Sequence, residues 1–296
     1  MRWVIITGMY NVADLATEFC RYYLGLGVDK IFVADYGSDD ETLDLLRSFV
    51  GAGQAQVVPL PTHHFASYNP SNAILKTIRE EDAADWVSFL DPDEFLTGPS
   101  DLKDRLTQEW SRGTEAIAVP RFNLTGLGPV SSQTHYLTNL TLKIVRTDVR
   151  VSNASAPLSS PWIFSRLPPK VMIRARSALT ITAGDHNVVG AGRKLEQSST
   201  FEILHLPMRS YAAFQEKIER GTEYFAKNSE LAPNTGWHWR RWIDLFQSGR
   251  LREEYEKQFL RPEVAEILLE EGRVVPETRL ADWWTNEQRR SGSDHL

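Results

Sequence analysis

Three carboxylates crowd into four positions of the segment WVSFLDPDEFLTG, which covers residues 86–98. Asp91, Asp93 and Glu94 come directly after an apolar run that is typical of a buried strand. Carboxylates this close together repel one another unless a cation or several hydrogen-bond donors hold them. The segment therefore predicts either a cation site or a simple turn at Asp91-Pro92-Asp93 that Glu94 caps.

The first hundred residues alternate between strand patterns and helix patterns. Apolar runs rich in β-branched residues predict buried strands at 3–7, 30–35, 55–60 and 86–90. Helically spaced apolar residues predict helices at 13–27, 38–49 and 69–83. This order is typical of an α/β fold, in which helices flank a mostly parallel sheet on both faces.

After residue 96 the regular alternation ends. We expect further strands within 115–124, 140–149, 170–182 and 201–206, a Ser- and Pro-rich loop at 151–169, and helices at 210–228 and 238–260. The sequence thus predicts an α/β domain over residues 1–210 and a helical C-terminal extension over residues 211–296.

Composition excludes several classes of protein. The net charge of −6 and pI near 5.7 argue against a nucleic-acid partner, because such proteins usually carry a basic face. The single cysteine, Cys20, rules out an internal disulfide and a thiolate zinc cluster. The apolar N-terminal stretch is too short to span a membrane, which indicates a cytoplasmic protein. Three Asn-x-Ser/Thr motifs, at Asn123, Asn139 and Asn153, would be modified only after secretion.

Polar clusters follow three of the predicted strands. They lie at residues 10–11, 35–40 and 91–94. In an open α/β sheet, ligands bind beyond the carboxyl ends of the strands. An acidic pair at this edge can hold Mg²⁺ or Mn²⁺, which can in turn bridge a diphosphate. For Asp39, Asp40 and Glu41 we favour a simpler role, in which they complement the dipole of the helix that follows.

Several ordered motifs resemble one enzyme family. The segment WVSFLDPDEFL resembles the Asp-x-Asp-Glu-Phe strand end of family-2-like glycosyltransferases with the GT-A fold, and is most similar to the bacterial subgroup related to galactan-synthase-type enzymes. The N-terminal residues 8–46 resemble the opening pattern of that group, as do PPKVMIRARSALTITAGDHNV and ILHLPMRSYAAFQEKIERG further on. Tyr10, Val12 and Tyr23 depart from the pattern. The match covers about residues 4–221.

The resemblance implies an activity. It implies a metal-dependent glycosyltransferase that moves a sugar from a nucleotide-diphosphate sugar, a UDP-sugar first of all, to a hydroxyl of a glycan or glycoconjugate, with inversion at the anomeric carbon. It implies Mn²⁺ or Mg²⁺ as cofactor, and a GT-A domain over residues 1–210 against which the C-terminal extension packs. It also suggests a role in surface polysaccharide synthesis at the inner face of the membrane, with a peripheral association.

The resemblance also assigns roles to individual residues. The metal ligands would be Asp91, Asp93 and His205. The catalytic base would be Asp185 or Glu94, with the choice left open. His186 and Trp162 would contact the acceptor or provide an alternative metal ligand. The implied donor-binding residues are Tyr10, Asn11, Asp35, Ser38, Asp91, Arg209 and Ser210.

Two other classes of function compete with this interpretation. A nucleotidyltransferase also combines an α/β sheet with acidic metal ligands, but it usually has a basic residue in the loop after the first strand, and TGMYNVAD has none. A non-catalytic carbohydrate-binding or scaffold protein could keep the same fold. The run GWHWRRW could stack on sugars or touch a membrane surface, although packing between helices is the interpretation that we favour.

Overall fold

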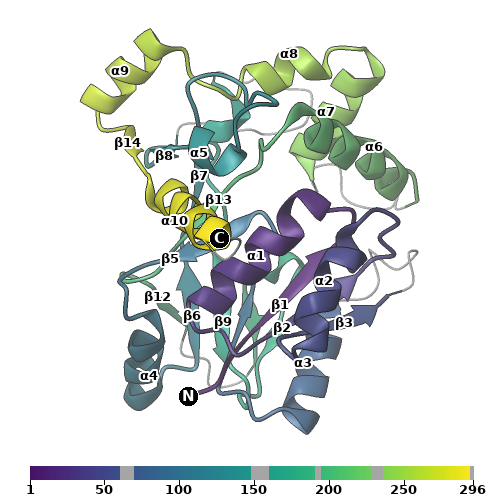
Figure 1. The fold of residues 1–296 in the computed structure, drawn as a ribbon, viewed down its shortest axis with the longest axis vertical. Helices are drawn as coiled ribbons and strands as arrows, with labels where there is room; N and C mark the ends of the chain where they lie inside the picture. The colour runs from purple at the N-terminus through teal and green to yellow at the C-terminus, as the bar shows by residue number, and fades with distance from the viewer. Residues whose placement is uncertain (61–69, 148–159, 191–194, 228–235, 294–296) are drawn as a thin grey trace. The chain divides into compact units, whose positions relative to one another are not determined.

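The computed structural model describes residues 1–60, 70–147, 160–190, 195–227 and 236–293 (Figure 1). The chain forms two compact units. Unit 1 consists of Met1–Arg121 and Pro168–Leu204, and unit 2 of Phe122–Leu167 and His205–Leu296. The chain therefore passes between the units three times. The predicted domain boundary after residue 210 stays a prediction.

Unit 1 is built on a seven-stranded sheet with the order β12-β6-β9-β4-β1-β2-β3. Strands β4, β1, β2 and β3 are parallel neighbours, β9 runs antiparallel to both β4 and β6, and β12 is parallel to β6. The predicted α/β fold class, with a mostly parallel sheet, is confirmed. The strands are β1 (Trp3–Met9), β2 (Lys30–Asp35), β3 (Ala55–Pro59), β4 (Trp86–Phe89), β6 (Ala116–Val119), β9 (Lys170–Arg174) and β12 (Leu195–Gln197).

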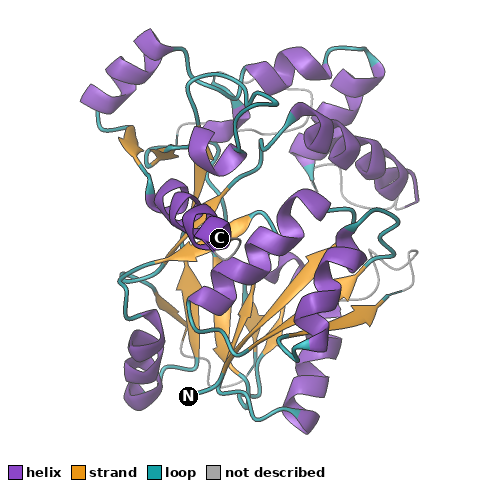
Figure 2. Ribbon diagram, in the orientation of Figure 1, coloured by secondary structure: helices purple, strands orange, loops and turns teal. Residues whose placement is uncertain are grey.

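Helices flank this sheet, as the apolar spacing predicts (Figure 2). The first three are α1 (Ala13–Gly25), α2 (Thr42–Gly51) and α3 (Pro70–Glu81). Ile74 and Ile78 of α3 pack in one buried cluster with Val4 and Ile6 of β1, so α3 covers one face of the sheet. Figure 1 shows α1 and α2 side by side. A fourth helix, α4 (Leu102–Arg112), was not predicted.

The register of the parallel strands brings their carboxyl ends together. Met9 at the end of β1 lies opposite Asp35 at the end of β2, and Ile6 lies opposite Phe89 at the end of β4. The loops that follow these three strands therefore leave the sheet at the same edge, which is where an open α/β sheet binds its ligands.

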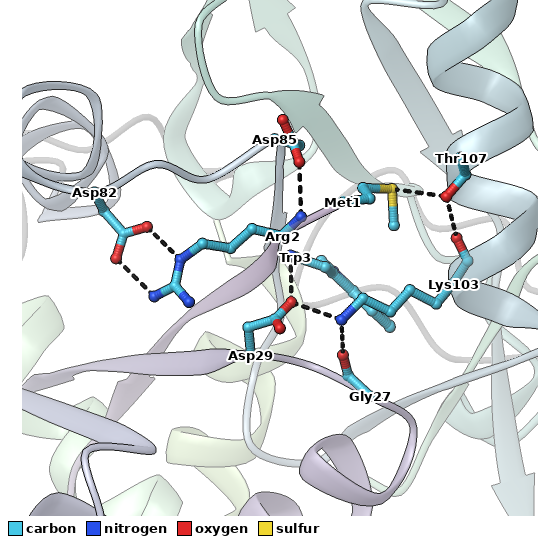
Figure 3. A network of polar contacts seen from close by, with 9 residues as sticks. All are labelled: Met1, Arg2, Trp3, Gly27, Asp29, Asp82, Asp85, Lys103 and Thr107. Atoms are coloured by element: carbon cyan, nitrogen blue, oxygen red, sulfur yellow. Dashed lines mark hydrogen bonds and ion pairs between the residues drawn. The ribbon is translucent and has the colours of Figure 1, made fainter.

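The opposite edge of the sheet is tied down by a polar network at the start of the chain (Figure 3). The guanidinium of Arg2 donates two hydrogen bonds to Asp82, at 2.6 and 2.9 Å. Asp29 accepts from the backbone N–H of Trp3 and from Lys103 Nζ, both at 2.8 Å. These contacts fix the beginning of β1. They lie away from the loops at the carboxyl ends of the strands, where a site could form.

The rest of unit 1 consists of short elements. β5 (Glu94–Thr97) begins inside the acidic motif, and the hydroxyls of Tyr22 and Tyr23 in α1 donate to the carbonyls of Leu96 and Glu94. The antiparallel pair β10 (Thr180–Ile181) and β11 (Val188–Val189) encloses a short 3₁₀ turn at Ala183–Asp185. β13 (Glu202–His205) leads out of the unit.

Unit 2 combines three short strands with six helices in its described part. The strands β7 (Arg121–Thr125), β8 (Leu142–Ile144) and β14 (Val274–Pro276) pair antiparallel in the order β7-β8-β14. The predicted helix at 238–260 is divided in two at Gly249, whose φ of 73° ends α7. No helix in the described ranges is long and apolar enough to cross a membrane. The helices are α5 (Tyr136–Asn139), α6 (Tyr211–Lys227), α7 (Trp237–Gln247), α8 (Leu251–Glu256), α9 (Pro262–Glu270) and α10 (Arg279–Ser293).

Candidate active site

The acidic motif forms a tight turn between β4 and β5. The backbone N–H of Glu94 donates to the carbonyl of Asp91 at 3.0 Å, with Pro92 at the second position, where a turn favours proline. The carboxylate of Glu94 reaches back and accepts the backbone N–H of Asp91 at 2.9 Å. The turn and its cap by Glu94 are thus both present. A cation, if one binds here, would be held by Asp91 and Asp93.

Glu94 is locked in place by two cations. Its side chain is fully buried and pairs with Arg121 through Oε1, while Oε2 lies 3.7 Å from Lys170 Nζ and also accepts the Asp91 N–H. A buried carboxylate with both oxygens engaged in this way is held rigidly in place. The geometry therefore favours a structural role for Glu94 over the role of base.

Lys170 links Glu94 to Asp91. Its buried Nζ lies 3.0 Å from Asp91 Oδ2 and donates to the carbonyl of Gly184 at 3.2 Å. Burial alone would lower the pKa of Lys170, but the nearby carboxylates outweigh burial and raise it, so the lysine stays charged. Desolvation would raise the pKa of Asp91, but Lys170 reverses the effect and holds it below its ordinary value. The side chain of Asp91 is 51% exposed, so it can still reach a ligand.

Asp185 lies beside this cluster with different properties. Burial, and after it the charge of Asp91, raises the pKa of Asp185 to about 6, although Lys170 and a hydrogen bond with Ser71 work against the rise. Its backbone has a φ of 60°, in the left-handed region that non-glycine residues rarely adopt. Such strain is often found at functional sites. A carboxylate with a pKa near 6 can accept a proton at neutral pH.

His186 follows Asp185 but lies with its ring turned back on the loop. Its Nδ1 donates to the carbonyl of Pro169 at 2.9 Å, because a carbonyl oxygen can only accept. Burial, together with the charges of Arg121 and Lys170, lowers the pKa of His186 to about 4. A Cβ built on Gly184 would lie 2.9 Å from His186 Nε2, so this edge of the ring packs closely over the glycine. The neutral ring is therefore less well placed than a free imidazole to bind a metal.

Tyr36 joins the same group of side chains from the end of β2. Burial, followed by the negative charges of Asp185 and Asp91, raises the pKa of Tyr36 to about 12, so the phenol keeps its proton and can donate. The ring lies against the backbone of Gly8 in β1, where an added Cβ would be 2.9 Å from the ring carbon Cε2. Glycine is required there for the ring to approach.

The loops after β1 and β2 are bound to each other through the predicted donor-binding residues. Asp35 is buried and accepts from the backbone of Gly37 and from the backbone and hydroxyl of Ser38. Ser38 Oγ in turn accepts the backbone N–H of Asn11 at 3.1 Å, and the side chain of Asn11 exchanges hydrogen bonds with Asp39. Asp35, Ser38 and Asn11 thus shape the loop that a nucleotide would meet. Tyr10 follows the last residue of β1 and is half-buried.

The carboxylate of Asp40 lies at the starts of two helices. Its carboxylate accepts the backbone N–H of Thr42 at the start of α2 and that of Ala13 at the start of α1. Both helices therefore begin with a negative charge at their positive end.

The other predicted site residues lie in unit 2. His205 is buried, with its Nδ1 2.7 Å from Asn123 Oδ1, and Trp162 packs near it with ring centroids 6.5 Å apart. Arg209 is buried, and Ser210 Oγ accepts the backbone N–H of Ala213 in the first turn of α6. His205 and Arg209 thus belong to one unit, and the acidic turn with Asp185 belongs to the other.

The predicted ligand set can be tested against the chemistry of a divalent ion. Asp91 and Asp93 offer carboxylate oxygens and His205 an imidazole nitrogen, which are donors that Mn²⁺ accepts, and the carboxylates also suit Mg²⁺. Within the ranges that the structure describes, no three or more His, Cys, Asp or Glu side chains are placed to hold one ion. These residue types are therefore ones that bind a divalent ion, although the described residues do not bring three of them together around one.

Four residues near the turn were not assigned a role from the sequence. Arg121, Lys170, Tyr36 and Ser71 all interact with Asp91, Glu94 or Asp185. Lys170 lies in the motif PPKVMIRARSALTITAGDHNV, and its place in that motif could have indicated a role from the sequence. The others become visible only when the fold places them next to the acidic turn.

Comparison with known families identifies the class of enzyme. The sequence model of Glycosyltransferase family 92 matches residues 6–231, which is most of the chain. The chain belongs to this family and is a glycosyltransferase. This agrees with the predicted GT-A class and with the α/β architecture of unit 1. A search among curated proteins finds no match.

Solved structures give weaker likenesses. Residues 1–349 of TarS from S. aureus, solved with UDP-GlcNAc, are 18% identical, with a TM-score of 0.44, and the alignment covers 86% of this chain and 78% of that one. The mannosyltransferase PcManGT from Pyrobaculum calidifontis, solved with GDP-Man and Mn²⁺, is 12% identical, with a TM-score of 0.42 and coverage of 92% and 79%. Glucosyl-3-phosphoglycerate synthase from Mycobacterium tuberculosis, solved with Mn²⁺ and UDP, is 19% identical, with a TM-score of 0.29 and coverage of 41% and 44%.

Proposed function

We propose that this glycosyltransferase transfers a sugar from a nucleotide-diphosphate sugar, a UDP-sugar first of all, to a hydroxyl of a glycan or glycoconjugate, with inversion. The observation that carries the proposal is the acidic turn at the end of β4. There Asp91 is held ionised by Lys170, and Asp185 lies beside it with a raised pKa. One site therefore combines a fixed negative charge with a carboxylate able to take a proton.

The geometry supports Asp185 as the base and leaves Glu94 as a structural residue. Glu94 is buried and engaged by Arg121 and Lys170 on both oxygens, so a proton would have to break an ion pair to reach it. Asp185 has a pKa of about 6 and is partly exposed. A base of this strength is ionised at pH 7 and can still accept a proton from a hydroxyl during attack.

The transfer step then balances as a single displacement. The acceptor oxygen attacks the anomeric carbon and forms a new C–O bond, while its proton passes to Asp185. The bond between the anomeric carbon and the phosphate oxygen breaks, and its electron pair leaves with the nucleoside diphosphate. Tyr36, which stays protonated, is placed near Asp185 and Asp91 to donate a hydrogen bond to a substrate oxygen.

A divalent ion fits this scheme as a cofactor. The motifs that resemble the glycosyltransferase pattern assign Mn²⁺ or Mg²⁺ to Asp91, Asp93 and His205, and the diphosphate to Arg209 and Ser210, and the proposal of a divalent ion rests on those motifs. When bound, the ion offsets the negative charge that builds on the leaving diphosphate. We favour His205 over His186 as the nitrogen ligand, because the Nε2 edge of His186 packs over Gly184.

The setting of the reaction is also part of the proposal. We place the enzyme in the bacterial cytoplasm, at the inner face of the membrane, with an acceptor that belongs to a surface polysaccharide. The motifs similar to galactan-synthase-type enzymes support this setting. Trp162 would lie near the acceptor.

A thermal-shift screen tests the donor. The protein is mixed with UDP, GDP, CMP or dTDP, each with Mn²⁺ and with EDTA. We expect UDP with Mn²⁺ to raise the midpoint and the rise to disappear in Asp93→Ala. A cooperative melt that no nucleotide shifts would contradict the proposed donor and metal.

A further inference from the structure

The hairpin that carries Asp185 is too short to hold its own shape. Its strands β10 and β11 pair over two residues each. An isolated two-stranded hairpin is marginally stable at best in water. The turn between the strands also keeps Asp185 at a φ of 60°, a conformation that persists only where the surroundings impose it. Contacts from outside the hairpin must therefore fix the Asp185 carboxylate.

Asn72, in the first turn of α3, makes such a contact. Its Nδ2 donates to the carbonyl of Ile181 in β10 at 2.8 Å, and its Oδ1 accepts the backbone N–H of the same residue at 2.9 Å. A neighbouring antiparallel strand would exchange the same two bonds with Ile181. Because one bond needs a donor and the other an acceptor, the pair also fixes the orientation of the amide. The Asn72 side chain thus takes the place of a third strand beside β10.

Ser71 precedes Asn72 and bonds to the carboxylate itself. Its hydroxyl forms a hydrogen bond with Asp185, and the residue is 8% exposed. Ile74 of the same helix lies in one buried hydrophobic cluster with Ile181. The first turns of α3 therefore hold the hairpin at two points, at β10 through Asn72 and at the carboxylate through Ser71.

We propose that Asn72 and Ser71 are positioning residues for sugar transfer, which fix the hairpin so that the Asp185 carboxylate meets the acceptor hydroxyl. This inference rests on the proposed function, in which Asp185 is the base, and it concerns residues outside the sequence motifs. All three residues belong to unit 1. A base must lie within hydrogen-bond reach of the proton that it takes, so a small displacement of the hairpin should slow the reaction.

Arg79 provides a matched comparison on the same helix. Its guanidinium donates to the carbonyls of Ala175 and Leu179, both at 2.7 Å. These two bonds also join α3 to the backbone of the segment 175–185, but they end before β10 begins. Loss of Arg79 or of Asn72 removes two bonds between a side chain and the backbone in either case. The two losses should therefore have similar effects on stability and different effects on catalysis.

The first test measures UDP release with Mn²⁺ from UDP-glucose, UDP-galactose or UDP-GlcNAc, with whichever nucleotide the wild type cleaves fastest. Asn72→Ala and Ser71→Ala should lower kcat about 10- to 100-fold, as expected when a reacting group is misplaced by about 1 Å. KM for the donor should stay near the wild-type value. Arg79→Met should lower the urea midpoint as Asn72→Ala does and keep kcat. Equal losses of kcat in Asn72→Ala and Arg79→Met would make Asn72 merely structural and overturn the inference.

A double variant separates positioning from a general loss of structure. Asp185→Asn already lacks the base, so the addition of Asn72→Ala should lower kcat no further. If Asn72→Ala lowers kcat by the same factor with and without the Asp185 carboxylate, Asn72 does not act through Asp185 and the inference fails, while the proposed function stands.

The second test needs no substrate. Hydrogen exchange in the free protein is followed at the backbone N–H of Asp185, which donates to the carbonyl of Thr182 at 3.0 Å. Exchange there should be faster in Asn72→Ala than in wild type and unchanged in Arg79→Met. Unchanged exchange in Asn72→Ala would overturn the inference, even if the enzyme transfers sugar. If Asn72→Ala speeds exchange but wild type releases no UDP from any of the three nucleotides, the contact holds the hairpin and the proposed function is wrong.

Discussion

Lys170 and Asp91 form an ion pair at the carboxyl end of the parallel sheet, with Nζ 3.0 Å from Oδ2. The same ammonium lies 3.7 Å from Glu94 and donates to the carbonyl of Gly184, next to Asp185. Lys170 thus holds the acidic turn and the Asp185 loop together. Its positive charge also offsets the repulsion among the carboxylates of Asp91, Glu94 and Asp185.

Removal of this cation should destabilise unit 1. In Lys170→Met, the buried Glu94 and its neighbour Asp91 lose a shared counter-charge, which typically costs about 3–5 kcal/mol. Urea unfolding at pH 7.5 should show the loss as a lower midpoint. A cost of less than about 1 kcal/mol would mean that Lys170 does not hold the turn.

Lys103→Met provides the matched control for that variant. Lys103 also pairs with an aspartate, Asp29, at 2.8 Å, but the two side chains are 35% and 30% exposed (Figure 3). Water screens such a pair, so the expected cost is at most about 1 kcal/mol. Equal losses in the two lysine variants would contradict the account of Lys170.

The ionised carboxylate of Asp185 should lower the free energy of unfolding at neutral pH. Its folded pKa of about 6 lies above the ordinary value, so the folded state holds the proton more tightly than the unfolded chain. Stability therefore falls as pH rises from about 4 to about 6, and the full cost is present above that range. Asp185→Asn should therefore melt at a higher temperature than wild type at pH 7.5. Because Asp185 is partly exposed, the gain in free energy of unfolding should be on the order of 1 kcal/mol. Melting curves at pH 4 and 7.5 test this, and the difference should vanish at pH 4.

The same group should govern the acid side of the activity profile. As a base it must be ionised, so kcat/KM for the acceptor should rise with pH through a value of about 6. In Asp185→Asn the activity should fall at least 100-fold and lose that limb. A variant that melts normally and keeps the wild-type profile would place the base elsewhere.

Gly8 should be intolerant of a side chain. In Gly8→Ala the new Cβ would lie 2.9 Å from the ring of Tyr36, so the ring must shift from its place near Asp185 and Asp91. We expect weaker UDP-sugar turnover and a loss of about 1–2 kcal/mol in stability, as is usual for overpacking. Gly25→Ala is the control, since nothing lies within 4 Å of its added Cβ, and it should behave like wild type.

The sequence was sufficient to predict the parallel part of unit 1. Its strands are continuous apolar runs and its helices have clear apolar stripes, so local patterns determine them. Helix α4 was missed because it is mostly polar, with Leu102 and Leu106 its buried residues, which gives a faint pattern. β5 was missed because four residues are too few to show an alternation.

The same limit of local patterns applies to the candidate site. The acidic turn lies in one short segment and could be recognised there. The cations that define its chemistry come from distant segments, as with Arg121, which pairs with Glu94 27 positions away. Such pairs depend on the tertiary fold, and local spacing cannot indicate them. Our proposal of Asp185 rather than Glu94 as the base likewise rests on the cations that engage Glu94.

The most direct measurement of the central claim is the release of UDP from a UDP-sugar by purified protein, with Mn²⁺ and with EDTA. Wild type should turn over with Mn²⁺ and lose turnover in EDTA, and both Asp93→Ala and Asp185→Asn should lose at least 100-fold. Asp44→Ala, which changes an exposed carboxylate on α2, should match wild type. If the Asp93 and Asp185 variants fold and release UDP as fast as Asp44→Ala, the assignment of this site to glycosyl transfer is wrong.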